Sequence, residues 1–204
     1  IIEKEELFGG AGTVTGTLPS KTLRETALYF SDKLEKGLYG IDRTFSQEAS
    51  MTDFMYRKNL VKDSSSKEVF DNLSRHHVSI FYGVASFEDA HTLHVQGKDH
   101  ISLFGEYIII ATGSYPYHPK NIPFDSKRVH DSDTILQLTR HPSSLCIVGA
   151  GVIGCEYATI FATIGTHVYL INDKEKILPH LDEEISHALV KEMQSSGIDI
   201  LFNT

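Results

Sequence analysis

The segment at residues 145–173, LCIVGAGVIGCEYATIFATIGTHVYLIND, constrains the fold more than any other part of the chain. A short apolar run precedes three glycines in the order G-x-G-x-x-G, namely Gly149, Gly151 and Gly154, and a helical pattern and a second apolar run follow. In a dinucleotide-binding βαβ unit the first glycine permits a tight turn, the second leaves space for a pyrophosphate, and the third lets the helix approach the sheet. Free N–H groups at the helix start then face the phosphates. The segment therefore predicts an α/β fold that binds a nucleotide.

Composition and charge exclude several other classes. The 204 residues are 41% hydrophobic and 23% charged, which is typical of a globular protein with a sizeable core. We find no apolar run of membrane-spanning length and no signal peptide, and we therefore expect a cytoplasmic protein. The formal net charge of −8, with scattered lysines and arginines, argues against a nucleic-acid partner.

The first half is expected to begin with two helices. One starts at Pro19, turns Leu23, Ala27, Phe30 and Leu34 inward and ends at Gly37. The other covers residues 52–76, and Ser64, Ser65 and Ser66 are a candidate break. Its expected buried stripe consists of Phe54, Val61, Val69 and Leu73.

Strands are expected at residues 78–84, 91–95 and 107–111, with a turn at 86–90 between the first two. The proline-containing stretch 114–140 is expected to be a connection. Residues 145–148 predict a strand buried on both faces, residues 167–171 predict a second strand, and residues 182–195 predict a helix. The two cysteines, Cys146 and Cys155, are expected to be small core residues.

Three other kinds of site find no support. The eleven histidines lack zinc-ligand spacing, so we expect no metal site. The serine-hydrolase elbow G-x-S-x-G does not occur, and neither does the phosphate-binding loop G-x-x-x-x-G-K-[ST].

Four ordered motifs resemble one family. They are GTLPSK at 16–21, ATGSYPYHP at 111–119, HDSDTIL at 130–136 and GAGVIGCEYATIF at 149–161. Together they resemble the two-dinucleotide flavoproteins of the pyridine nucleotide-disulfide oxidoreductase family, in particular its transhydrogenase members. The resemblance implies two Rossmann-like dinucleotide-binding domains, both incomplete here: an FAD-binding part at residues 1–115, a connection at 116–144 and an NAD(P)-binding part at 145–204.

The resemblance also implies a set of site residues. Lys21 lies near the reactive edge of the flavin and pairs with Glu156, and these two form the implied catalytic pair. Glu3 holds the adenosine ribose of FAD. The other implied FAD contacts are Gly10, Thr13, Val84, Ala85, Thr112 and Gly113. Gly149, Gly151 and Gly154 bind the nicotinamide coenzyme.

The implied activity is hydride transfer between NADPH and NAD through FAD. Disulfide reductases of this family carry a redox cysteine pair at the positions of Gly12 and Thr17, and neither residue forms a thiolate. Val14 and Thr15 also depart from the pattern expected of the transhydrogenases. Two alternatives remain open: a catalytically inactive nucleotide-binding fragment, and a flavin-dependent NAD(P)H dehydrogenase with another acceptor.

The end of the second apolar run predicts the choice of coenzyme. An NAD-specific site places an acid there to hold the ribose 2′-hydroxyl. This chain has the neutral Asn172, followed by Asp173 and Lys174, and Lys176 lies just beyond. We therefore expect both NAD and NADP as substrates.

The ends of the chain suggest a piece of a longer protein. The glycine fingerprint for FAD is expected roughly 20 residues before Glu3, which lies outside this sequence. We therefore expect the piece alone to retain FAD poorly. The longer protein is expected to be a homo-oligomer that assembles through a C-terminal domain.

Overall fold

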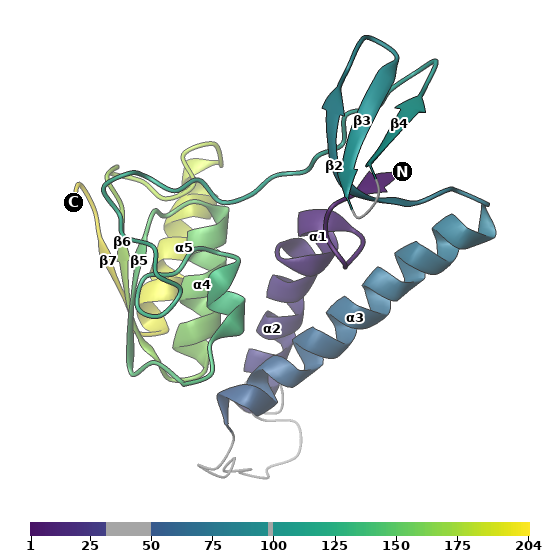
Figure 1. The fold of residues 1–204 in the computed structure, drawn as a ribbon. Coiled ribbons are helices and arrows are strands. Elements are labelled where there is room, and N and C mark those ends of the chain that lie inside the picture. Colours follow the sequence, from purple (N-terminus) through teal and green to yellow (C-terminus); the bar gives the residue numbers. More distant parts are fainter. Residues whose placement is uncertain (32–49, 98–99) are drawn as a thin grey trace.

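The computed structural model describes residues 1–31, 50–97 and 100–204, which form two sheets with helices between them (Figure 1). The expected α/β class is confirmed. Leu34 and Gly37, which were expected to complete the first helix, lie outside the described residues.

The first sheet has four strands in the order β1-β2-β3-β4. Their bounds are Ile2–Glu3, Phe81–Phe87, Thr92–Gly97 and His100–Phe104. The pair β1–β2 is parallel, and the other two pairs are antiparallel. The predicted turn between β2 and β3 is confirmed, whereas β4 was not predicted.

The strand predicted at 107–111 is wrong. Tyr107, Ile109 and Ile110 are 86%, 89% and 71% exposed, and none of the strands in the described part of the chain pairs with them. An apolar run becomes a strand only where a neighbouring strand accepts its backbone hydrogen bonds. Residues 100–104 have such a neighbour in β3, so the hairpin forms there instead.

Three helices lie between β1 and β2 in the sequence: α1 (Gly10–Val14), α2 (Thr17–Phe30) and α3 (Met51–Arg75). A capping box at the start of α3 joins Ser50 and Asp53. The serine run does not break α3, which corrects our expectation. Instead Ser66 is buried, and its hydroxyl accepts a hydrogen bond from the backbone N–H of Phe8 at 2.6 Å.

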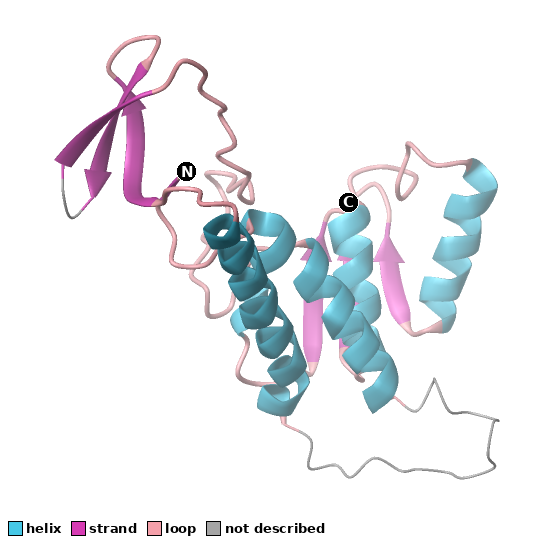
Figure 2. Ribbon diagram, turned by 90° about the vertical axis from the view of Figure 1, so that its right-hand side faces the viewer, coloured by secondary structure: helices cyan, strands magenta, loops and turns pink. Residues whose placement is uncertain are grey.

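The second sheet is parallel, in the order β5-β6-β7. Its strands are Ser144–Val148, His167–Ile171 and Ile198–Leu201, connected by α4 (Val152–Thr163) and α5 (Glu183–Ser195). A short 3-10 turn at Thr134–Gln137 precedes β5. Because parallel crossovers are right-handed and the strand order follows the sequence, α4 and α5 lie on the same face of the sheet, as Figure 2 shows.

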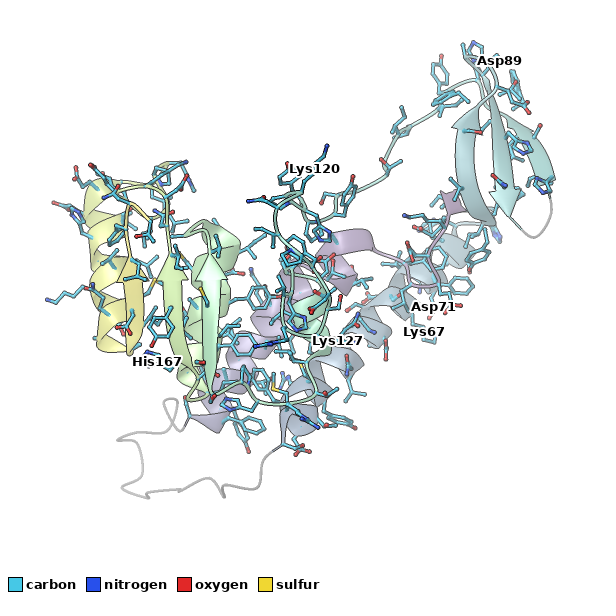
Figure 3. All side chains as sticks on the ribbon, turned by 60° about the vertical axis from the view of Figure 1, so that its left-hand side comes forward. Lys67, Asp71, Asp89, Lys120, Lys127 and His167 are labelled. Carbon is cyan, nitrogen blue, oxygen red and sulfur yellow. The ribbon has the colours of Figure 1, made fainter. Side chains whose placement is uncertain are left out.

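The other face of this sheet is open, so the prediction of a strand buried on both faces is wrong. Val148 is 73% exposed, and Cys146 is exposed rather than in the core. His167 lies on the same face, where its Nε2 atom is 3.0 Å from an Asp199 oxygen (Figure 3). Cys155, on the helix side, is buried as expected. The apolar run alone gave no indication that only one face is covered.

One hydrophobic core connects the two halves. Helix α2 packs between α3 and α4, so that Leu23 and Phe161, both fully buried, belong to the same cluster as Val168 of β6. Lys58 of α3 is buried too, and it donates to the carbonyl of Leu136 at 2.8 Å. No helix within the described ranges combines the length and hydropathy needed to cross a membrane.

Candidate nucleotide and flavin site

The glycine turn between β5 and α4 has the geometry of a phosphate site. Gly149 has φ +102°, a left-handed conformation that favours glycine. A Cβ on Gly154 would lie 1.9 Å from the carbonyl oxygen of Gly149, so only glycine allows this close approach of helix and strand. By contrast, a Cβ on Gly151 would meet nothing within 4 Å. This free space lies at the N-terminus of α4, so the turn fits the pyrophosphate of a dinucleotide.

Asn172, at the end of β6, supports this turn from within. Its side chain is 6% exposed, and its Oδ1 atom accepts from the backbone N–H of Ala150 at 3.4 Å. Its Nδ2 group donates to the carbonyl oxygens of Lys174 and Lys176, both at 3.0 Å. The amide thus holds the loop after β6 against the glycine turn, and its direct contact with a coenzyme stays a prediction.

The loop after β6 presents charged side chains. Asp173 and Lys174 are exposed. The Lys176 Nζ atom lies 3.0 Å from Glu183 Oε1, so the Lys176 charge is already paired within the protein. Lys174 is therefore the cation of this loop that is best placed to meet a ligand.

Lys21 and Glu156 come together, as the resemblance implies. The Lys21 Nζ atom lies 3.9 Å from Glu156 Oε1, and the Ser20 hydroxyl donates to Glu156 Oε2 at 3.1 Å. The two contacts join α2 to the first half of α4. Lys21 is 66% exposed, so its ammonium group is accessible to a ligand.

The other implied FAD residues are spread along the first half. One oxygen of Glu3 accepts from the backbone N–H groups of Lys4 and Glu5, at 2.8 and 3.0 Å. Gly10 and Thr13 lie on α1. Val84 and Ala85 are exposed on β2, and Thr112 and Gly113 are exposed in the connection. Their contact with FAD stays a prediction.

The connection contains a polar cluster that the sequence did not predict. Asp131 Oδ1 accepts from the backbone N–H groups of Asp133 and Thr134, at 3.0 and 2.7 Å, and Oδ2 lies 2.6 Å from His118 Nε2. Burial raises the pKa of Asp131, but these hydrogen bonds outweigh it, and the pKa falls to about 2. The HDSD motif that contains Asp131 contributed to the resemblance, but nothing in its spacing indicated this role.

Two further contacts extend from this turn. The Ser132 hydroxyl donates to an Asp133 carboxylate oxygen at 3.4 Å, and Tyr157 of α4 donates its phenolic hydroxyl to the Ser132 carbonyl at 3.0 Å. Burial raises the pKa of Asp133, and it raises that of Tyr157 as well. The turn is therefore hydrogen-bonded to α4.

The two positions at which the resemblance places a redox cysteine pair carry no thiol. Gly12 lies on α1 and Thr17 begins α2, and both are exposed. Cys155 lies elsewhere, on α4, where burial raises the pKa of its thiol to about 11. Among the residues that the structure describes, no group of three or more metal-ligating side chains is placed to hold a metal ion.

Comparison with known proteins agrees with this arrangement. Residues 7–204 match the family model described as pyridine nucleotide-disulphide oxidoreductase. A soluble pyridine nucleotide transhydrogenase of Mycobacterium tuberculosis is 37% identical over 99% of this chain, and one of Yersinia pestis is 39% identical over the whole chain. The chain covers 44% of each of these relatives, so it spans less than half of their length.

Solved structures show the same fold. The HOCl-induced flavoprotein disulfide reductase RclA from Escherichia coli superposes with a TM-score of 0.83 at 28% identity, covering all of this chain and 43% of that one. LpdA from Mycobacterium tuberculosis superposes with a TM-score of 0.89 at 18% identity, covering all of this chain and 45% of that one. The family match, the relatives and the glycine turn lead to one conclusion: this chain belongs to the pyridine nucleotide-disulphide oxidoreductase family.

Proposed function

We propose that this chain carries the part of an FAD-dependent transhydrogenase in which flavin and nicotinamide meet. The enzyme transfers a hydride from NADPH to NAD⁺, giving NADP⁺ and NADH, or catalyses the reverse reaction. The observation that carries the proposal is the Lys21–Glu156 contact, which joins α2, the helix that begins at the second redox-pair position, to the helix of the glycine turn. FAD, when bound, would supply the hydride-transfer chemistry between the two coenzymes.

The residues of this chain have separate tasks in that reaction. Lys21 would hold a fixed cation at the bound flavin, where positive charge stabilises negative charge on the ring. Glu156 and Ser20 orient the Lys21 side chain. The glycine turn binds the coenzyme pyrophosphate, and Gly12 and Thr17 leave no thiolate to pass electrons to a disulfide.

The proposal extends to the domains and the coenzymes. Residues 1–115 contribute to an FAD domain and residues 145–204 to an NAD(P) domain, with 116–144 between them. Lys174 serves the 2′-phosphate of NADP(H), and Asp173 serves the free hydroxyl of NAD(H), because both side chains are exposed beside the turn. The enzyme acts in the cytoplasm as a homo-oligomer, and its other partners are the two small-molecule coenzymes.

The test uses the natural full-length protein that contains this chain. Purified with its flavin, it should reduce thio-NAD⁺ with NADPH, and lipoamide and glutathione disulfide should give no turnover above the rate without acceptor. Lys21→Met should lower the transhydrogenation rate at least tenfold, whereas Lys67→Met, an exposed lysine on α3, should leave it within twofold. Disulfide reduction faster than transhydrogenation would refute the proposal, and turnover with a quinone alone would favour an NAD(P)H dehydrogenase.

A further inference from the structure

Two histidines on the antiparallel part of the first sheet face each other. The Nδ1 atom of His100 lies 3.5 Å from the Nε2 atom of His94. The two ring planes meet at 18° and the ring centroids are 5.6 Å apart, so the rings lie edge to edge, with a nitrogen of each directed at the other. Neither histidine takes part in the proposed function, so a role for this pair is independent of it.

The strand register brings these two residues together. In the pairing of β3 with β4 (Figure 1), His94 stands opposite Ser102, and His100 stands opposite Gln96. His94 and His100 are therefore diagonal neighbours, and because side chains alternate between the faces of a strand, both lie on one face of the sheet. We expected no metal site because spacing along the sequence does not reveal a pair formed across two strands.

A carboxylate lies behind His94. The Oε1 atom of Glu88, which directly follows β2, is 3.6 Å from His94 Nδ1, and it accepts a hydrogen bond from the Ser102 hydroxyl at 3.0 Å. The negative charge favours a proton on Nδ1 of His94, and this tautomer leaves the Nε2 lone pair free on the side of His100. Metal-binding histidines commonly have such a carboxylate behind them, and it strengthens their binding.

The distance between the two nitrogens fits a shared metal ion. A tetrahedral ion bonded to imidazole nitrogens at about 2.0–2.1 Å separates two of them by roughly 3.3 Å. The 3.5 Å between the His94 and His100 nitrogens therefore needs only a small adjustment. A hydrated cation can reach the pair from solvent, because the His94 side chain is 35% exposed and the Glu88 side chain is 45% exposed.

The chemistry of the ligands selects the kind of ion. Neutral imidazole suits late first-row transition metals such as Zn²⁺, Ni²⁺ and Cu²⁺, whereas Mg²⁺ and Ca²⁺ prefer oxygen ligands. Within the part of the chain that the structure describes, no third side chain joins the pair as a ligand, so water fills the other positions around the ion. The Glu88 carboxylate and the net charge of −8 both attract a cation.

We propose that His94 and His100 bind one divalent transition-metal ion, with Glu88 orienting His94 from behind. The ion crosslinks β3 to β4, so its binding favours the folded hairpin. Without the ion, a single N–H···N hydrogen bond is the most that the two facing nitrogens can form, because only one of them can donate to the other. The site lies apart from the glycine turn, which is on other elements of the fold.

The experiment titrates zinc chloride into the natural full-length protein, purified with its flavin and without an affinity tag. Isothermal titration calorimetry should show a step of one zinc ion per chain, which His94→Ala and His100→Ala each weaken at least tenfold. Glu88→Gln should weaken it about tenfold, because the carboxylate acts on the ion only through His94. Magnesium chloride should give no such step.

The matched control is His91→Ala. The Nδ1 atom of His91 lies 3.3 Å from the Gly105 carbonyl oxygen, beside the same hairpin but outside the pair, so zinc affinity should stay within twofold. Saturating zinc should raise the Tm of wild type and of this control, and raise that of His94→Ala less. Absence of the one-ion step in wild type, or an equal loss in His91→Ala, would overturn the inference. Should an alanine variant fail to fold, glutamine at the same position replaces it, and unchanged zinc affinity there would overturn the inference as well.

Discussion

The Oδ1 atom of Asn172 accepts a hydrogen bond from the backbone N–H of Ala150, across 3.4 Å, in the middle of the glycine turn. Asn172→Ala removes this bond and the two that Nδ2 donates to the following loop. At about 1 kcal/mol for each bond, the free energy of unfolding should fall by about 2–3 kcal/mol. Urea unfolding measures it, with Asn72→Ala on the exposed face of α3 as the control. A loss no larger than in that control would show that the amide does not support the turn.

Gly151 and Gly154 should respond in opposite ways to the same substitution. Gly154→Ala places a methyl group 1.9 Å from the Gly149 oxygen, so we expect a loss of about 3 kcal/mol or more in stability. Gly151→Ala meets nothing within 4 Å and should cost less than about 1 kcal/mol, although its methyl group occupies the space for the pyrophosphate.

Two measurements on each glycine variant distinguish these cases. Thermal unfolding should give a lower Tm for Gly154→Ala than for wild type. NADH fluorescence titration should show at least tenfold weaker binding for Gly151→Ala. Normal NADH affinity in a folded Gly151→Ala protein would contradict the placement of the pyrophosphate.

Lys174 should discriminate between the coenzymes. Lys174→Ala removes an exposed cation beside the turn, so NADPH binding should weaken about 3- to 10-fold, while NADH binding changes less than twofold. Lys191→Ala, an exposed lysine on α5, should affect neither. Titrations with both coenzymes at constant ionic strength give the comparison, and an equal loss for the two would mean that Lys174 does not contact the 2′ position.

Asp131 should make the free energy of unfolding depend on pH in the acidic range. Its folded pKa of about 2 lies below the ordinary aspartate value, so its ionised form favours folding. That contribution, about 2 kcal/mol, is fully present above the ordinary pKa and is lost as the pH falls through the folded pKa. Asp131→Asn should therefore be less stable than wild type by about 2 kcal/mol at pH 7, and the difference should shrink between pH 5 and pH 2. Asp173→Asn, an exposed aspartate, serves as control, and a difference that does not vary with pH would exclude this origin.

The sequence predicted the elements whose pattern is local. The glycine turn, α4, β6 and α5 follow from spacing and capping alone, since each fixes its own backbone. The strand at 107–111 and the burial of Cys146 were wrong because both depend on what lies beside them, which an apolar run does not indicate.

The candidate site was predictable to the same extent. The resemblance indicated that Lys21 meets Glu156, and the structure brings them together. It did not indicate that the Ser20 hydroxyl also reaches Glu156, because side chains more than a hundred positions apart meet only through the packing of α2 and α4.

The core that α2 and α4 share determines how the molecule unfolds. Leu23 and Phe161 belong to one apolar cluster, although they come from opposite halves of the chain. Loss of either half exposes the buried side chains of the other, so the two form a single foldon. Melting should then follow one cooperative transition, and a protease cut in the exposed stretch around Tyr115 should yield two pieces that remain associated until they unfold together.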